Sequence, residues 1–433
     1  MTPAPPRSLL LQQVQLLAGP DQQPTPTDVL LSGPELTALG EEARQRATAL
    51  GLTPLPAQGW LLAPCLVDPH SHLEDPWLGT AETLASLERS ASAAGYGTIA
   101  LLPRARSWRD RPEQLQALLS RDSALQLLLW GSFSRGGEGL ELAGHGDQLA
   151  AGAIGLADGE TCPPLVLLER GLTLAELGAA PLLLAPRDSS LSQNGFVREG
   201  VETLRAGWPP DPLSSELLPL QTLLSLARLL PERRLRLMNL STAAGVDQLA
   251  ALPAERRPLA SVCWWHLLAD SGRLDPMAEG WRVVPPLGTP ADRRALQRGL
   301  AEGVISAVAV HHTALDAEEQ LLPLDQRKPG VAGHRFVLPC LWQELVVAAG
   351  WSVPQLWRAL CFGPAALLGL EPPRLEPGSH RWLLFDPESR WRAAEDAEAP
   401  LAANQPLANA ELTGRVLATG LRAELWRGPQ LPA

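Results

Sequence analysis

The sequence predicts an α/β protein: a (β/α)8 barrel flanked by a small β-sandwich that the two ends of the chain form together. The 433 residues exceed the usual size of one hydrophobic core, and α/β barrels are the common exception to that limit. From Leu62 onward, short apolar runs alternate with amphipathic segments, which indicates alternating strands and helices. Short strands are expected again near both termini. The predicted division is 1–62 for the N-terminal part of the sandwich, 63–377 for the barrel and 378–433 for the C-terminal part of the sandwich.

Each element follows from a short apolar run and the turn or helix signals beside it. The barrel strands are expected up to His70 and at residues 98–102, 125–130, 154–156, 181–184, 235–238, 260–263 and 305–310. The sandwich strands are expected at residues 9–11, 28–31, 59–62, 382–385, 390–392, 416–418 and 423–426. A helix is expected near residues 34–50, between two of these sandwich strands.

Composition narrows the class of function. The formal net charge of −11 argues against a nucleic-acid or anionic-membrane surface, because both need clustered basic residues. The five cysteines are scattered and odd in number, which favours a reduced, cytoplasmic setting over a disulfide framework. The N-terminus lacks the signal-peptide pattern, and no stretch reaches the roughly 18 apolar residues of a membrane span, so a soluble protein is expected.

The pair His70 and His72 is the strongest chemical signal in the chain. The two histidines follow an apolar stretch, at the end of a predicted strand. Side chains two apart in a strand share a face, so both imidazoles can chelate one divalent metal ion, usually zinc. Lys328 is the only lysine and lies in a loop with Pro329 and Gly330, so a two-metal site bridged by a carbamylated lysine is not expected.

Several blocks, in order along nearly the whole chain, carry a resemblance to a known family. The strongest are Val67-Asp68-Pro69-His70-Ser71-His72-Leu73 and Gly152-Ala153-Ile154-Gly155-Leu156-Ala157-Asp158-Gly159. The chain resembles dihydroorotases of the cyclic amidohydrolase superfamily, zinc-dependent hydrolases of cyclic amide C–N bonds in pyrimidine biosynthesis. The resemblance implies a TIM barrel of the amidohydrolase type with a β-sandwich. It also implies that His70 and His72 bind zinc and that Asp158 stands where one branch of the family uses an aspartate ligand.

Other positions of the resemblance depart from the family pattern. Ala185 and Asn239 stand where the family has its next two metal-binding histidines. His311 replaces an aspartate that serves the family as ligand and general base. Glu74 replaces the arginine that binds the substrate carboxylate.

The remaining pocket positions are also only partly kept. Val284 and Gly288 replace a substrate-binding asparagine and arginine, whereas His266 and His312 match family positions around the pocket. His266 is also interpreted as a packing residue at a strand end.

Two interpretations of the remaining histidines stay open. His70, His72 and His311 form a three-histidine zinc site with Asp158 as fourth ligand or base, or His311 is hydrogen-bonded to Asp158 or Glu74 without any metal. At most one zinc ion is expected.

The main functional hypothesis is a noncatalytic dihydroorotase-like protein. The resemblance implies that it acts as a partner of another protein, for example aspartate carbamoyltransferase, within a homo- or hetero-oligomer. The alternative is an active mononuclear zinc cyclic amidohydrolase, either a dihydroorotase or a hydrolase of a related cyclic amide or imide.

Overall fold

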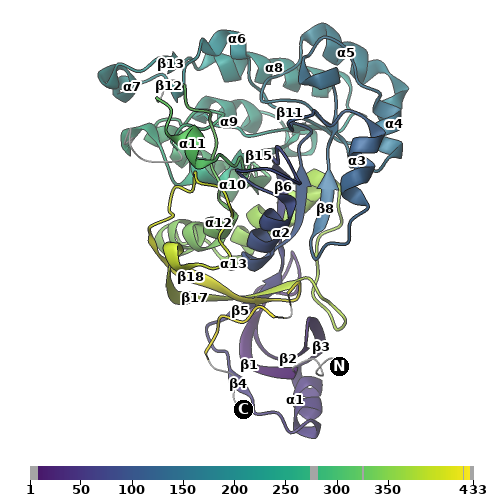
Figure 1. Cartoon of the computed structure of the whole chain (residues 1–433), viewed down its shortest axis with the longest axis vertical. Helices are drawn as coiled ribbons and strands as arrows, with labels where there is room; N and C mark the ends of the chain where they lie inside the picture. Colours follow the sequence, from purple (N-terminus) through teal and green to yellow (C-terminus); the bar gives the residue numbers. More distant parts are fainter. Residues whose placement is uncertain (1–7, 274–280, 324–325, 423, 430–433) are drawn as a thin grey trace.

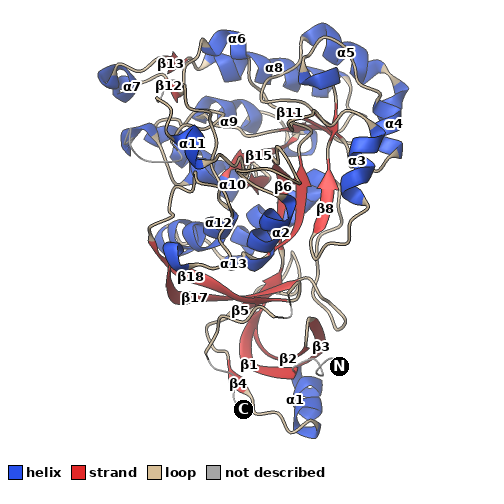
Figure 2. Ribbon diagram, viewed as in Figure 1, coloured by secondary structure: helices blue, strands red, loops and turns tan. Residues whose placement is uncertain are grey.

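The computed structural model describes residues 8–273, 281–323, 326–422 and 424–429. Figure 1 shows a larger α/β part, and a smaller β-rich part at one end of the long axis that holds the described segments nearest both termini. Figure 2 shows strands inside the larger part with helices around them. Within the described residues, no helix is long and apolar enough to span a membrane.

The barrel strands run parallel in two hydrogen-bonded series. The first series is β6 (Leu66–Ser71), β7 (Tyr96–Leu101) and β8 (Gln126–Leu129). The second series is β9 (Gly131–Ser132), β10 (Leu156–Ala157), β11 (Leu182–Leu184), β14 (Leu235–Leu237), β15 (Leu259–Cys263) and β16 (Ala307–Ala309). Most of these strands are short, buried and apolar, as expected for a sheet covered on both faces, whereas β8 is only partly buried.

Backbone hydrogen bonds join the two series into a ring. Only Trp130 separates β8 from β9, and its N–H donates to Leu101 O, so β8 and β9 are two halves of one strand. At the other end, His311 N donates to His70 O at 3.2 Å and His72 N donates to His312 O at 2.7 Å. The described strands therefore form the eight-stranded barrel that the sequence predicts, with each expected strand in place.

Some of the helices around the barrel begin at a side-chain cap. Thr83 accepts a hydrogen bond from Ser86 N at the start of its helix, and Thr289 forms a capping box with Asp292. The helices after the strands are α2 (Leu84–Ala93), α3 (Pro112–Leu119), α4 (His145–Ala150), α5 (Leu165–Thr173), α8 (Ser214–Leu229), α9 (Ala243–Ala250), α10 (Pro290–Ala301), α12 (His334–Leu341), α13 (Val353–Trp357) and α14 (Gly363–Leu368). Shorter elements are α6 (Ser189–Ser192), β12 (Val197–Arg198), α7 (Val201–Ala206), β13 (Pro210–Asp211) and α11 (Ala317–Gln320).

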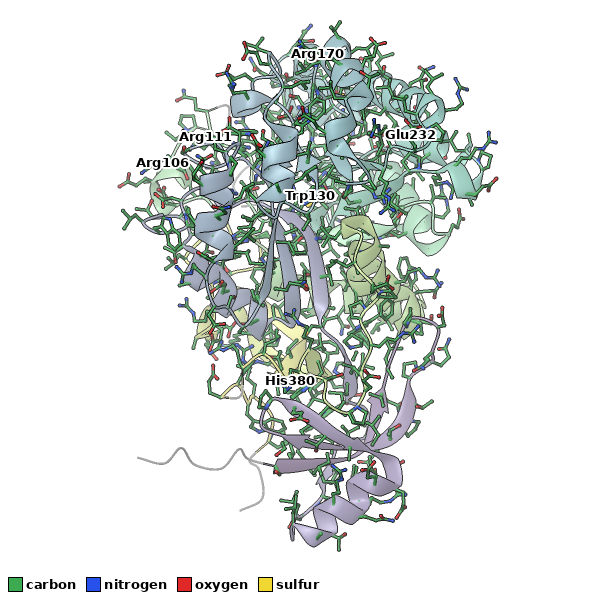
Figure 3. All side chains as sticks on the ribbon, turned by 90° about the vertical axis from the view of Figure 1, so that its right-hand side faces the viewer. Arg106, Arg111, Trp130, Arg170, Glu232 and His380 are labelled. Atoms are coloured by element: carbon green, nitrogen blue, oxygen red, sulfur yellow. The ribbon has the colours of Figure 1, made fainter. Side chains whose placement is uncertain are left out.

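Both ends of the chain contribute to the sandwich. Its seven-stranded sheet contains β1 (Ser8–Leu16), β2 (Thr25–Ser32), β3 (Glu35–Leu39), β4 (Leu55–Pro56), β5 (Leu61–Pro64), β17 (Trp382–Arg392) and β18 (Glu411–Thr419). Leu11 and Leu62 from the first segment share one apolar core with Leu384 and Leu417 from the last. Among the residues that Figure 3 labels, Trp130 lies in the barrel and His380 lies beside the sandwich.

Two local predictions differ from the structure. The helix expected near 34–50 is confirmed as α1 (Gly40–Ala49), but it begins later, because Glu35–Leu39 alternates partly buried and buried residues and pairs with β2. The strand expected at 423–426 is not formed by Glu424 to Trp426, which run as turn and coil, and Ala423 lies outside the described residues.

Candidate metal centre at the barrel mouth

The candidate site lies at the barrel mouth, the end where the carboxyl ends of the strands meet. His70 lies within β6, His72 follows it directly, and His311 follows β16 after one residue. Hydrogen bonds between the ends of β6 and β16 hold these segments side by side. Catalytic groups of (β/α)8 barrels lie at this end because several loops converge there.

Three side chains from different loops converge at the mouth and are called the His–Glu group below. They are His72, His311 and Glu160, the last in the loop after β10. Glu160 Oε1 lies 2.7 Å from His72 Nε2 and 3.2 Å from His311 Nε2. One ligand atom from each residue lies within 4.8 Å of the other two, close enough for a single metal ion.

Burial and mutual contacts shift the pKa values of two members of the His–Glu group, His72 and Glu160. Burial lowers the pKa of His72 to about 4, although the hydrogen bond with Glu160 acts in the opposite direction. Burial acts to raise the pKa of Glu160, but the charge and hydrogen bonds of His311 and His72 outweigh it and hold that pKa well below its usual value. A neutral imidazole and an ionised carboxylate are the forms in which these side chains bind metals.

His70 lies next to the His–Glu group but uses both ring nitrogens elsewhere. Its Nδ1 lies 3.1 Å from His311 Nδ1, and its Nε2 lies 2.7 Å from Ser261 Oγ on β15. The side chain is fully buried, and burial, followed by the neighbouring His311, lowers its pKa well below the usual value. His70 therefore orients His311 and is tied to the barrel interior, while His72 faces Glu160.

Asp158 is turned away from the His–Glu group. Its two carboxylate oxygens accept hydrogen bonds from Ser134 Oγ at 3.0 and 2.8 Å, and burial raises its pKa to about 6. The carboxylate expected beside His311 was Asp158 or Glu74, whereas the structure has Glu160 there. In the described part of the chain, His72, Glu160 and His311 are the one group of three or more such residues that could hold a metal.

The positions of the two missing histidines border a small cavity behind Glu160. The cavity measures about 10 Å³ and is lined by Ala185, Asn239, Arg187 and Val284 among others. Both polar atoms of the Asn239 side chain and Nη1 of Arg187 are buried there without a hydrogen-bond partner among the described residues. Asn239 also has a positive φ of 55°, which asparagine tolerates better than most residues.

Two further spaces reach the mouth. One, beside His311 and Val284, also measures about 10 Å³. The other, called the mouth cleft below, measures about 300 Å³ and is lined by His72, Glu74 and Lys328, with further charged residues of both signs. The large space is therefore polar and lies on the outer side of the His–Glu group.

The two remaining predicted pocket residues lie behind the mouth. His266 is buried, its Nε2 lies 2.9 Å from Pro285 O, and burial lowers its pKa to about 4. His312 is 1% exposed, and its ring lies 3.5 Å from Glu82. Neither imidazole is among the residues that line the mouth cleft.

Glu160 is the functional candidate that the sequence analysis did not identify. It stands two residues after Asp158, a spacing that places both carboxylates on one face wherever a segment is extended. Two features of the sequence could have indicated Glu160 as a metal ligand. A His-x-His pair needs a third donor to complete a metal site, and the loop after the fourth barrel strand contains two carboxylates. The pattern could not show which of the two faces the histidines.

The donor set of the His–Glu group fits a divalent metal ion. Two imidazoles and one carboxylate are the ligands of several catalytic zinc sites that leave a fourth position open. Both Nε2 atoms approach the same carboxylate oxygen, and one ligand atom from each of the three residues lies within 4.8 Å of the other two. Nδ1 of His72 is buried without a hydrogen-bond partner among the described residues, so Glu160 is the one side chain there that orients this ring through a hydrogen bond.

Comparisons with known proteins found relatives by sequence and solved structures with a similar fold. No family model matches the chain. A protein of Synechocystis sp. named "Probable dihydroorotase-like protein" is 36% identical over 84% of this chain and 89% of the relative. The dihydroorotase of Thermus aquaticus is 28% identical over 88% of this chain and 90% of the relative.

Solved structures of two further enzymes share the fold. The L-hydantoinase (dihydropyrimidinase) of Arthrobacter aurescens has a TM-score of 0.77 at 18% identity, covering 95% of this chain and 94% of that chain. The D-hydantoinase (dihydropyrimidinase) of a Thermus species has a TM-score of 0.75 at 18% identity, covering 96% and 94%. At this identity the likeness concerns the fold alone.

Proposed function

The chain belongs to the dihydroorotase family, and on that premise we propose that it is a noncatalytic member that keeps the barrel scaffold and acts as a protein partner in pyrimidine biosynthesis. The partner proposed is aspartate carbamoyltransferase, in a cytoplasmic hetero-oligomer. The observation that carries the noncatalytic part is the small space left at Glu160 and His311, neither of which lines the mouth cleft. The cavities beside His311 and behind Glu160 measure about 10 Å³ each, which is close to the volume needed for one water molecule.

Charge at the mouth supports the same proposal. Dihydroorotate is an anion, and Glu74 lines the mouth cleft where the family arginine would bind the substrate carboxylate. Leaving a substrate charge without its partner in a buried site costs on the order of 2–5 kcal/mol. His311 stands at the position of the family general base, and loss of a positioned base typically lowers the rate by roughly 10²- to 10⁴-fold.

A scaffold function needs a well-packed fold. The barrel core is continuous, and Trp130, Trp264 and Trp357 are fully buried in it. Large apolar side chains also remain exposed on helices, among them Val166 on α5 and Leu229 on α8. Such residues are available for contacts with another chain.

Co-purification tests the partnership. The full chain and aspartate carbamoyltransferase from the same organism are mixed and separated by size exclusion, and the thermal stability of the transferase is measured with and without this chain. We expect co-elution and a higher melting temperature of the transferase. Separate elution with an unchanged melting temperature would refute the partnership. The variant Glu160→Gln is the matched control, because a scaffold that does not use the mouth retains full binding.

The His–Glu group favours a second candidate, a mononuclear zinc cyclic amidohydrolase with an altered substrate. His72, Glu160 and His311 would hold the ion, and a bound zinc ion would polarise the scissile carbonyl and lower the pKa of a bound water molecule. Glu74 in the mouth cleft favours a neutral or cationic ring over an anionic one.

Metal analysis separates the two candidates. A zinc content near one equivalent per chain, lost in His72→Ala and in Glu160→Gln, would favour the hydrolase. That result would be followed by an activity screen with neutral cyclic amides and imides. A bound-zinc content far below one equivalent per chain, after incubation with a slight molar excess of zinc, would rule out the hydrolase. The exposed Glu232→Gln serves as the matched control and should bind as the wild type does.

A further inference from the structure

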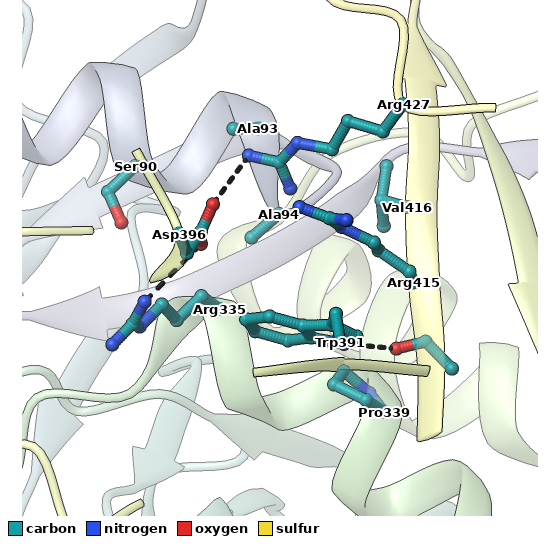
Figure 4. A pocket seen from close by; sticks show the side chains of 11 residues that line it. Ser90, Ala93, Ala94, Arg335, Pro339, Trp391, Asp396, Arg415, Val416 and Arg427 are labelled. Atoms are coloured by element: carbon teal, nitrogen blue, oxygen red, sulfur yellow. Dashed lines mark hydrogen bonds and ion pairs between the residues drawn. The ribbon is translucent and has the colours of Figure 1, made fainter. Parts of the chain in front are cut away.

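A second polar pocket lies where the sandwich meets the barrel helices, and it is called the arginine pocket below. It is formed by α2, α12, β17, β18 and the segment that follows β18. Figure 4 shows Arg335, Arg415 and Arg427 around Asp396, with Trp391 below them. The arginine pocket shares no lining residue with the mouth cleft, so it is independent of the proposed function.

Positive charge exceeds negative charge in the lining of the arginine pocket. Three guanidinium groups stand against the single carboxylate of Asp396. Arg427 Nη2 lies 3.1 Å from Asp396 Oδ1, and Arg335 Nη1 lies 3.3 Å from Asp396 Oδ2. The chain as a whole carries a net charge of −11, so this local excess is not part of a generally basic surface.

Arg415 is the guanidinium group without an acceptor. It lies over the ring of Trp391, 5.5 Å from the ring centroid, and makes no hydrogen bond or ion pair to the residues that the structure describes. Nε of Arg415 and Nε of Arg335 are both buried without a partner in the same part of the chain. Buried donors of this kind are normally satisfied, so an acceptor from outside the chain is expected.

The surroundings limit the size of that acceptor. The pocket measures about 20 Å³, which accommodates one small group and not a ring. The side chain of Arg427 is 14% exposed, so the pocket reaches the surface and a larger molecule can insert one end. Guanidinium groups match oxyanions through paired hydrogen bonds, and several arginines around one site are typical of phosphate binding.

We propose that the arginine pocket binds a phosphate group through Arg415, with Arg427 and Arg335 as supporting donors and Trp391 as the floor. The phosphate is either inorganic phosphate or the end of a small phosphomonoester. Because the pocket joins α2 and α12 to the β17–β18 hairpin, bound phosphate stabilises the attachment of the sandwich to the barrel.

Calorimetric titration and thermal unfolding of the full chain test the proposal. Inorganic phosphate, glycerol phosphate and, at equal ionic strength, acetate and chloride are the probes. We expect saturable binding of one phosphate group per chain, a melting temperature that rises with phosphate and levels off, and at least tenfold weaker binding in Arg415→Gln. Tighter binding of glycerol phosphate than of phosphate would identify the phosphomonoester as the source.

Arg390→Gln is the matched control, because Arg390 is an exposed arginine on the same hairpin and does not line the pocket. It should bind phosphate within twofold of the wild type. Equal binding by Arg415→Gln and wild type, or a rise in melting temperature that chloride reproduces, would overturn the proposal. If Arg415→Gln does not fold, Arg415→Lys replaces it, and unweakened binding by that variant would equally overturn the proposal.

Discussion

Two buried histidine–carboxylate clusters lie near the junction of β6 and β16, and they differ in how completely their polar atoms are paired. In the first, Asp68 Oδ1 accepts a hydrogen bond from Val310 N at 3.0 Å, and Oδ2 accepts from Ser71 Oγ and from His334 Nε2 at 2.9 Å. His312 N donates in turn to Ser71 Oγ. The first cluster ties the last barrel strand to the first and leaves no oxygen of Asp68 free.

The second cluster is the His–Glu group. Glu160 Oε1 serves both His72 Nε2 and His311 Nε2, and His72 Nδ1 has no partner among the described residues. Paired groups stabilise a fold, whereas groups that converge without full pairing can accept a ligand. A histidine beside a carboxylate is therefore not by itself a sign of catalysis. Whether the other polar atoms of the two side chains are hydrogen-bonded decides the role of the cluster.

The variant Asp68→Asn should have the largest effect on stability. The amide places a donor against Ser71 Oγ and His334 Nε2 in a fully buried position, so the free energy of unfolding should fall by about 3 kcal/mol. Guanidinium denaturation measures the change. The exposed Asp122→Asn should stay within about 0.5 kcal/mol, and an equally small effect of Asp68→Asn would show that the first cluster does not close the barrel.

If the His–Glu group holds zinc, as the hydrolase candidate requires, the metal should stabilise the second cluster and not the first. At a free zinc concentration 100 times the dissociation constant, the free energy of unfolding should rise by about 2.7 kcal/mol. Glu160→Gln should lose this gain because it removes the charged ligand, whereas Asp122→Asn should keep it. Undiminished stabilisation of Glu160→Gln by zinc would place the metal elsewhere.

Ser261→Ala tests whether the Ser261 hydroxyl stabilises the position of His70, which lies between the two clusters. Ser261 Oγ lies 2.7 Å from His70 Nε2 and accepts a hydrogen bond from Asn239 N at 3.0 Å. Removing it leaves both nitrogens unpaired, so we expect a loss of about 1.5 kcal/mol in chemical denaturation. The exposed Ser120→Ala should be neutral, and an equally neutral Ser261→Ala would contradict the support assigned to this hydroxyl.

Glu160→Gln without metal should have the smallest effect. Its side chain is 17% exposed, and the amide keeps an oxygen that can accept from one imidazole. In the presence of a chelator, the free energy of unfolding should change by less than about 1 kcal/mol. A loss as large as that of Asp68→Asn would make the His–Glu group a structural cluster of the same kind as the first.

Most of the fold followed from the sequence because strand and helix periods are local properties. The eight barrel strands were all expected, since each is a short apolar run beside a turn or a helix signal. The helix near 34–50 was placed too early because the alternating run Glu35–Leu39 is short and the helical run follows it without a break.

The site was less predictable because it depends on side-chain direction across the barrel. The sequence identified His70, His72 and His311, but it could not show that His70 turns to Ser261. Asp158 and Glu160 stand two residues apart, a spacing that predicts one shared face, whereas the structure pairs Asp158 with Ser134 and Glu160 with the two histidines.

The most direct test of the central claim is hydrolysis of dihydroorotate by the full chain after loading with zinc. A dihydroorotase of the same family, for example that of Thermus aquaticus, serves as the positive control, and bound zinc is measured in the same samples. We predict no turnover above that of the Glu160→Gln variant, with at most one zinc ion per chain. Robust turnover of dihydroorotate with two bound zinc ions would contradict the account.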